Sequence, residues 1–396
     1  MQKKSLTFMA AALVAGAAFA QSGPTVYGVA DLAVESVSAT GATVVTADIP
    51  SRTRLQANSS LLGVKGKFDL GGGTAAIYQF ETYIDMGSNQ AGANMAVPTA
   101  GTTTPTNSGM VSPLQSMFGA RRDTFVGLTG EWGTLRAGYL TTGFRGAVAK
   151  CDLAPGATGA TAAYEVFGFA GNPSTTPVGA TYFNRYNAVN YSTPVMGGFS
   201  ASVNYLVNTA KSANNATNQV DPGGWDALVR FETKLFHVTL VHTDLKDFLF
   251  GTVAHETNKA DTLLASVMLP TGTTISGMYN ASKSTLQATP GSAETEAKQN
   301  SFYIGIKQVV GPHQFMVNYQ SAAKFKANGT DLANTSASMI GARYGYDLIK
   351  NVQIYGEYSK ITNESASKYN FNVGAVTGTA TGSDPQVVGL GLRVSF

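Results

Sequence analysis

Charged residues are scarce in this 396-residue chain. Asp, Glu, Lys and Arg make up 13% of it, whereas a typical soluble domain contains about 25%. Beyond the N-terminus, no apolar run approaches the roughly 18 residues that a membrane-spanning helix requires. The composition therefore fits neither an ordinary soluble protein nor a helical membrane protein.

Sequence motifs for catalysis, cofactor binding and metal binding are also missing. The four histidines form no His-Glu-x-x-His, and the chain has no Gly-x-Ser-x-Gly, Cys-x-x-Cys or Gly-x-x-x-x-Gly-Lys. The single cysteine, Cys151, cannot form an internal disulfide, and we interpret it as an incidental loop residue. We therefore expect a protein that is not an enzyme and has no cofactor and no metal.

The net charge argues against a nucleic-acid partner. The chain carries 27 basic and 24 acidic residues, and removing Lys3 and Lys4 leaves 25 basic residues. Binding to a nucleic acid depends on a marked excess of positive charge. We expect no such partner.

The N-terminus has the pattern of a secretory signal. Lys3 and Lys4 precede an apolar stretch from Leu6 to Phe19, which ends in the small-x-small sequence Ala18-Phe19-Ala20. We predict that residues 1–20 are a signal peptide and that residues 21–396 form a single exported domain.

Alternation with a period of two is the main positive signal. In the last segment Val388, Leu390, Leu392 and Val394 alternate with small or polar residues, and similar segments recur along the chain. Successive side chains of a strand point to opposite faces. Glycine (44 residues) and Tyr plus Phe (37 residues) are abundant, as is typical of membrane barrels whose strands are half apolar.

The connections between these segments alternate between short and long. Short ones include 70–73, 130–133, 194–198, 270–273, 310–312 and 348–351, and long ones include 87–117, 143–184, 209–223, 284–298 and 363–384. Tight turns at one end and long loops at the other are typical of outer-membrane barrels. The sequence predicts an all-β fold: a 16-stranded antiparallel transmembrane β-barrel with short periplasmic turns and long external loops.

Five segments, in order, resemble one protein family. They are "TVYGVADLAVESV", "LLGVKGKFDLGGGTAAIYQFETYID", "RRDTFVGLTGEWGTLRAGY", "NRYNAVNYSTPVMGGFSASVNY" and "ARYGYDLIKNVQIYGEYSKITN". The chain also ends on an aromatic residue, Phe396. In these features it resembles the general porins of Gram-negative bacteria, of the β-proteobacterial Neisseria and Burkholderia type.

This resemblance implies an outer-membrane diffusion porin, a passive channel for ions and small hydrophilic solutes. It also implies a homotrimer in contact with outer-membrane lipid and lipopolysaccharide, and recognition of Phe396 by the barrel assembly machinery. The third external loop, about residues 143–184, is expected to fold into the lumen and narrow it.

The resemblance further implies arginines on the wall opposite that loop, which favour anions. Two of three such family positions carry arginine here, Arg122 and Arg185, whereas the third falls on Leu61. We therefore expect a weak anion preference.

Strand parity adds further lumen charges. Taking the face opposite the apolar one as inward places Lys65, Arg136, Lys307, Arg343 and Arg393 inside, with Asp31 and Glu357. Charges around a narrow aqueous passage select ions. The candidate site residues are the wall cations Arg122, Arg185, Arg136 and Lys65 and the loop acids Asp152 and Glu165.

Three alternatives remain open at this point. An outer-membrane enzyme would require a nucleophile and base assembled from distant residues. An adhesive barrel would use its long polar loops to bind a host or a phage. A substrate-specific channel would need a continuous track along the lumen, of which only Tyr27 and Tyr355 are visible.

Overall fold

A computed structural model gives the structure of the chain. It describes residues 22–58, 60–84, 86, 122–168, 185–207, 221–247, 255–289 and 291–396. The predicted signal peptide and the predicted loop at 87–117 lie outside these residues.

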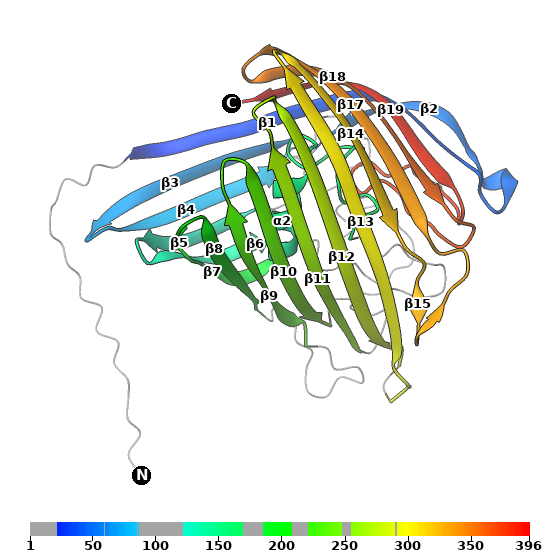
Figure 1. The fold of residues 1–396 in the computed structure, drawn as a ribbon, viewed down its shortest axis with the longest axis horizontal. Coiled ribbons are helices and arrows are strands. Elements are labelled where there is room, and N and C mark those ends of the chain that lie inside the picture. The colour runs from blue at the N-terminus through cyan, green and yellow to red at the C-terminus, as the bar shows by residue number, and fades with distance from the viewer. Residues whose placement is uncertain are drawn as a thin grey trace, which may run out of the picture.

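One antiparallel sheet contains all the strands of the described residues and bends into a barrel (Figure 1). The strands are β1 (Ser22–Thr40), β2 (Ile49–Ala57), β3 (Leu61–Gly71), β4 (Thr74–Tyr83), β5 (Thr124–Gly130), β6 (Gly133–Thr141), β7 (Arg185–Ser192), β8 (Phe199–Leu206), β9 (Gly223–Glu232), β10 (Phe236–Lys246), β11 (His255–Met268), β12 (Thr273–Gln287), β13 (Thr295–Val310), β14 (His313–Ala322), β15 (Lys326–Ala327), β16 (Thr330–Asp331), β17 (Ala337–Ile349), β18 (Val352–Asn363) and β19 (Asp384–Ser395).

The barrel wall has sixteen positions. β2 and β3 pair with successive halves of β1 and therefore act as one interrupted strand, while β15 and β16 form a two-residue hairpin within a loop. β1 also pairs with β19, which closes the barrel, and Gly28 exchanges two backbone hydrogen bonds with Phe396, of 2.9 and 3.0 Å. The predicted 16-stranded antiparallel barrel is confirmed.

The alternating pattern explains why the wall has two different faces. On β19 the outward Val388, Leu390 and Leu392 are 49%, 72% and 46% exposed, whereas Gly389 and Gly391 face the interior. Apolar side chains on the outer face suit a hydrocarbon environment. Closure of the sheet gives every strand a neighbour on both sides. The backbone N–H and C=O groups thereby find the hydrogen-bond partners that a hydrocarbon environment cannot provide.

Short turns occupy one end of the barrel and longer connections the other. The six short connections predicted from the sequence are all tight turns, and residues 233–235 form a seventh. The long loop predicted at 284–298 is wrong in extent, because β12 runs on to Gln287 and β13 begins at Thr295. Polar side chains suggested a loop there, but the paired backbones continue the ladder past the apolar part of the wall.

The third loop, residues 142–184, folds into the barrel over its described part, 142–168 (Figure 1). It begins with α2 (Gly143–Cys151), whose apolar face consists of Phe144, Ala147, Val148 and Cys151. This spacing gives a single helical stripe. The stripe packs on inward apolar side chains of β8, β10 and β11, namely Leu206, Val241, Leu245 and Leu264. No helix among the described residues has the length and apolarity to cross a membrane.

The last loop, residues 364–383, also folds inward, which the sequence analysis did not predict. Its Tyr369, Phe371 and Val376 are buried against the third loop and the walls of β17 and β18. Carbonyls of the same loop accept hydrogen bonds from Arg54 and Arg52 of β2. Two loops therefore fill part of the barrel interior.

Candidate functional site

A cavity of about 490 Å³ lies between α2 and the wall from β5 to β9. Five arginines line it: Arg122, Arg136, Arg145, Arg185 and Arg230. Among the described lining residues, Asp123 is the only carboxylate. The cavity therefore carries a strong excess of positive charge on one side of the third loop.

Two of these arginines form ion pairs at the edge of the cavity. Arg122 pairs with Glu81 of β4, and Arg185 Nε lies 2.9 Å from Asp123 Oδ1. Thr141 also donates to Asp123, at 2.6 Å. These contacts fix both guanidinium groups against the wall, so their charges have defined positions.

The other wall arginines make no ion pair with a described residue. Arg136 donates two hydrogen bonds to Asn190 Oδ1, at 2.8 and 3.2 Å, and its guanidinium lies over the Phe125 ring. Arg230 Nε donates to Thr239 Oγ1 at 3.4 Å. Neutral partners orient these groups without cancelling their charge.

Arg145 lies on α2 of the third loop and contributes the fifth positive charge of the cavity. Burial, followed by the nearby charge of Arg185, lowers the pKa of Arg145 to about 10, so the group is still protonated at neutral pH. The first turn of α2 fixes its position, because the Thr142 side chain caps the helix and Gly143 N donates to Asp226 Oδ1 at 2.9 Å. A Cβ at Gly143 would lie 2.3 Å from that oxygen, so this contact requires glycine.

The far side of the third loop is anchored to the wall by Gln320 of β14. Gln320 Oε1 accepts from the amides of Val166 and Phe167, at 3.0 and 3.1 Å, and Nε2 donates to Ala162 O at 2.7 Å. Asn318 Nδ2 donates to Thr161 O at 2.8 Å. The loop is thus held as a fixed internal layer.

Replacing Gln320 with Leu should loosen residues 162–168 of the loop. The substitution leaves buried backbone donors without a partner, which costs roughly 2 kcal/mol, or about a thirtyfold larger opening equilibrium. Hydrogen exchange of the Val166 and Phe167 amides is the measurement. Gln314→Leu is the matched control, because Gln314 lies on the same strand and donates to Asp347 Oδ2 rather than to the loop. Unchanged protection in Gln320→Leu would show that other contacts hold this segment.

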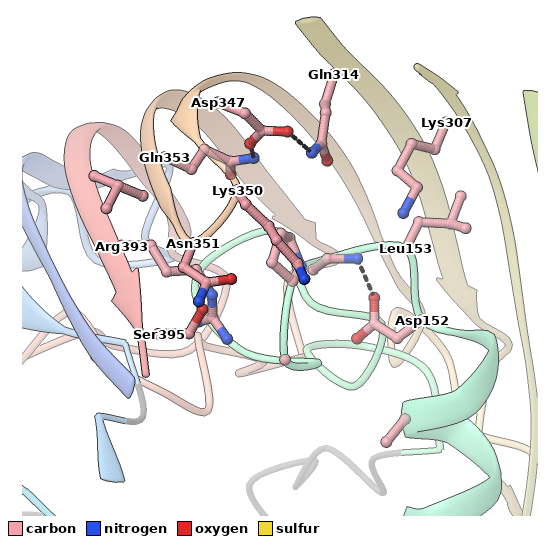
Figure 2. A pocket seen from close by; sticks show the side chains of 15 residues that line it. Asp152, Leu153, Lys307, Gln314, Asp347, Lys350, Asn351, Gln353, Arg393 and Ser395 are labelled. Carbon is pink, nitrogen blue, oxygen red and sulfur yellow. Dashed lines mark hydrogen bonds between the residues drawn. The ribbon is translucent and has the colours of Figure 1, made fainter. Parts of the chain in front are cut away.

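A second cavity of about 390 Å³ lies behind the third loop, next to the turn at Lys350 and Asn351 (Figure 2). Asp152 faces it, with its two carboxylate oxygens accepting from Ala154 N at 2.9 Å and Ala163 N at 2.8 Å. Burial raises the pKa of Asp152 to about 7, against the effect of those amides and of Lys307. Asp152 therefore stabilises the fold of the loop through these two hydrogen bonds.

The six candidate residues separate into different environments. Arg122, Arg185 and Arg136 lie together in the arginine-lined cavity. Lys65 is on the inner face of β3, 5.0 Å above the Tyr27 ring, and lines neither cavity. Asp152 lies behind the loop.

Glu165 is placed away from any passage. Its side chain has no exposed surface, and its carboxylate accepts from the Asn372 amide of the last loop. Burial raises the pKa of Glu165 well above its usual value. The residue joins the two inward loops, and its placement does not support a role as a lumen charge.

Arg230 was not predicted as a site residue, although its strand carries the signal. On β9, Ala227, Val229 and Phe231 alternate with Asp226, Leu228 and Arg230, so strand parity places Arg230 inward. Arg145, on the third loop, was not predicted as a site residue either. Among the described residues, no group of three or more His, Cys, Asp or Glu side chains is arranged to hold a metal ion.

The family model for Gram-negative porins matches residues 6–366 of the chain. Among curated relatives, the major outer membrane protein P.IB of Neisseria gonorrhoeae is 30% identical over 161 residues, which are 41% of this chain and 36% of that protein. P.IA of Neisseria meningitidis serogroup C is 27% identical over 183 residues, 45% of this chain and 37% of that protein. The matches thus span little more than a third of these relatives.

Solved structures extend the likeness in fold to almost the whole chain. The anion-selective porin from Comamonas acidovorans superposes with a TM-score of 0.72 at 22% identity, covering 94% of this chain and 99% of that one. OmpT of Vibrio cholerae, in its trimer form, gives 0.60 at 13% identity over 94% and 100%. The family model, which matches most of the residues, and the barrel fold agree: the chain belongs to the Gram-negative porin family, whose barrels lie in the outer membrane.

Proposed function

We propose that this porin is a passive diffusion channel for ions and small hydrophilic solutes, with a preference for anions and no enzymatic activity. The observation that carries the proposal is the arginine-lined cavity between α2 and the wall from β5 to β9. A positively charged constriction attracts anions and repels cations. On its opposite side the described part of the third loop packs against the wall and the last loop and leaves a cavity only next to the turn at Lys350 and Asn351. We therefore assign the passage to the arginine side.

Charge within the cavity supports the anion preference. The wall lacks an arginine at Leu61, where the family resemblance implies one, but Arg145 and Arg230 add two positive charges. Five arginines face two paired carboxylates, Asp123 and Glu81. The structural neighbour from Comamonas is named as anion-selective, in line with this proposal.

The partners follow from family membership. We propose a homotrimer, as OmpT of Vibrio cholerae is described in a trimer form, in contact with outer-membrane lipid and lipopolysaccharide. Phe396 directly follows β19 and is 62% exposed, so it is accessible for recognition by the barrel assembly machinery. The signal peptide at residues 1–20 also remains a proposal.

Single-channel recording in a planar bilayer tests the channel function. The refolded mature chain should insert with three conductance levels per event, and the reversal potential in a salt gradient should have the sign of an anion-preferring pore. A folded barrel that passes no current would reject the channel function, and a cation-selective reversal potential would reject the assigned passage.

A further inference from the structure

Three serines form a patch on the inner wall of the arginine-lined cavity. On β8, Ser200 and Ser202 point inward, because the alternating Phe199 and Val203 are exposed on the outer face. Ser192 of β7 is directly opposite Ser202 in the strand pairing, and residues directly opposite on neighbouring strands share one face of a sheet. All three are half-buried and line the cavity. We call these three residues the serine patch.

An arginine flanks the serine patch on each side. Arg230 of β9 is directly opposite Ser200. Arg136 of β6 is directly opposite Asn190, which is the inward residue next to Ser192 on β7. Neighbouring strands are about 4.8 Å apart, and successive inward residues of one strand are about 7 Å apart. The backbone of each arginine is therefore within about 8 Å of a serine of the patch.

The hydrogen bonds within the patch leave acceptors, rather than donors, for a solute. Ser192 Oγ donates its single hydrogen to Asn190 Oδ1 at 3.1 Å. In the 3.0 Å contact between Ser192 Oγ and Ser202 Oγ, Ser202 is therefore the donor. Ser202 Oγ itself accepts from Asn190 Nδ2 at 2.8 Å. Both serine hydrogens are thus in use, and each of these two oxygens retains one lone pair.

The charged groups at the two ends of this network fix its direction. Arg136 can only donate, so Asn190 turns its oxygen towards Arg136 and its amide nitrogen towards β8. On β8, Asn204 accepts from that nitrogen at 2.8 Å and donates to the Asp226 carboxylate at 2.9 Å. Arginine and carboxylate impose the same orientation on both amides. The acceptor character of the serine patch therefore follows from the wall itself.

Small residues of the third loop line the same cavity. They are Gly146 and Ala149 of α2, and Gly156 and Ala157 beyond it. Their side chains form no hydrogen bonds and leave room for a carbon chain. A solute in this cavity thus meets three kinds of surface: guanidinium donors, serine acceptors and small apolar groups.

We infer that this cavity preferentially passes monocarboxylates that carry several hydroxyl groups, the chemical class of the sugar acids. The inference rests on the proposed channel function and on the assigned passage. The carboxylate accepts from Arg230 or Arg136, and the hydroxyl groups of the same molecule donate to the serine patch. An anion without hydroxyl donors removes water from the serine oxygens and gives them no bond in exchange.

The test compares two organic anions by their reversal potentials in a planar bilayer, each as its potassium salt against potassium chloride, with the refolded mature chain. Gluconate carries a hydroxyl donor on every carbon after the carboxylate. Methoxyethoxyacetate is also hydrophilic and of similar length, but its ether oxygens only accept. One net hydrogen bond should make gluconate about fivefold more permeant than methoxyethoxyacetate.

Replacing all three serines with alanine, Ser192→Ala/Ser200→Ala/Ser202→Ala, should lower this permeability ratio to about one. Ser200→Ala alone is a second variant that disturbs no existing contact, because Ser200 makes no side-chain hydrogen bond with a described residue. It should lower the ratio about twofold.

Thr129→Ala/Thr134→Ala is the matched control. These two hydroxyls of β5 and β6 contact each other at 2.8 Å on the inner wall, and neither residue lines the cavity. Their replacement should leave the permeability ratio of gluconate to methoxyethoxyacetate unchanged.

Two outcomes would overturn the inference while a chloride current upholds the channel function. One is equal permeability of the two anions in the unchanged protein, and the other is the same ratio in the unchanged protein and the triple serine variant. A folded barrel without chloride current would reject the channel function itself, and the inference with it.

Discussion

Replacing Arg122 and Arg185 with Ala should shift the reversal potential in a salt gradient towards cations. Each substitution removes a positive charge from the passage and leaves a carboxylate, Glu81 or Asp123, without its partner. A unit charge about 7 Å from a permeating ion, in a screened aqueous passage, changes the energy of that ion by a few tenths of a kcal/mol. The anion-to-cation permeability ratio should therefore fall roughly fivefold to tenfold.

The reverse substitutions provide a control of opposite sign. Glu81→Gln with Asp123→Asn removes the two carboxylates, keeps the side-chain volume and leaves all five arginines, so the preference for anions should increase. Lys360→Gln, on the same outward face of β18 as the exposed Ile354 and Tyr358, should leave the reversal potential unchanged. If the arginine pair and the carboxylate pair leave the reversal potential in place, ions do not pass through this cavity.

Trimming residues 150–165 from the third loop should raise the single-channel conductance at least about twofold, because a sixteen-stranded barrel without an internal layer is open to water. These residues pack against the inner wall from β12 to β18, with hydrogen bonds to Ser276, Asn318 and Glu357. They include the buried Tyr164 and Glu165. Planar-bilayer recording of the trimmed and unchanged proteins measures the difference.

Trimming 370–378 from the last loop is the comparison for this experiment. Those residues pack on the third loop and bond Arg52 and Arg54 of β2, away from the five arginines of the cavity. Their removal should therefore raise conductance less and leave the anion preference nearly unchanged. A trimmed third loop with unchanged conductance would mean that the narrowest part of the passage is elsewhere. The presence of folded barrel should be verified by its resistance to unfolding in detergent.

The wall of the barrel was predictable because its signal is local. Alternation along β19 and the Gly-rich turn at 71–73 each depend on a few adjacent residues. Inward placement of Arg136, Lys307 and Arg393 follows from the same parity. The pairing register between neighbouring strands then determines which residues of the next strand also point inward.

The interior was less predictable because its contacts join distant segments. The last loop reaches the third loop through Glu165 and Asn372, 207 residues apart, and nothing near Phe371 indicates that it is buried. A partial signal existed on β10, where Val241 and Leu245 are apolar at inward positions. These inward apolar residues form the surface on which α2 packs, but the sequence pattern was not used to predict it.

Closure of the barrel by β1 and β19 also has a consequence for the order of folding. Arg393 and Asp31 are 362 residues apart and lie 2.7 Å from each other, and proteins dominated by such distant contacts fold slowly. Until β19 pairs with β1 and β18, these two strands are unpaired edges of the partial sheet and can pair with other chains. The final twelve-residue strand therefore ends the period in which the growing barrel is vulnerable to aggregation.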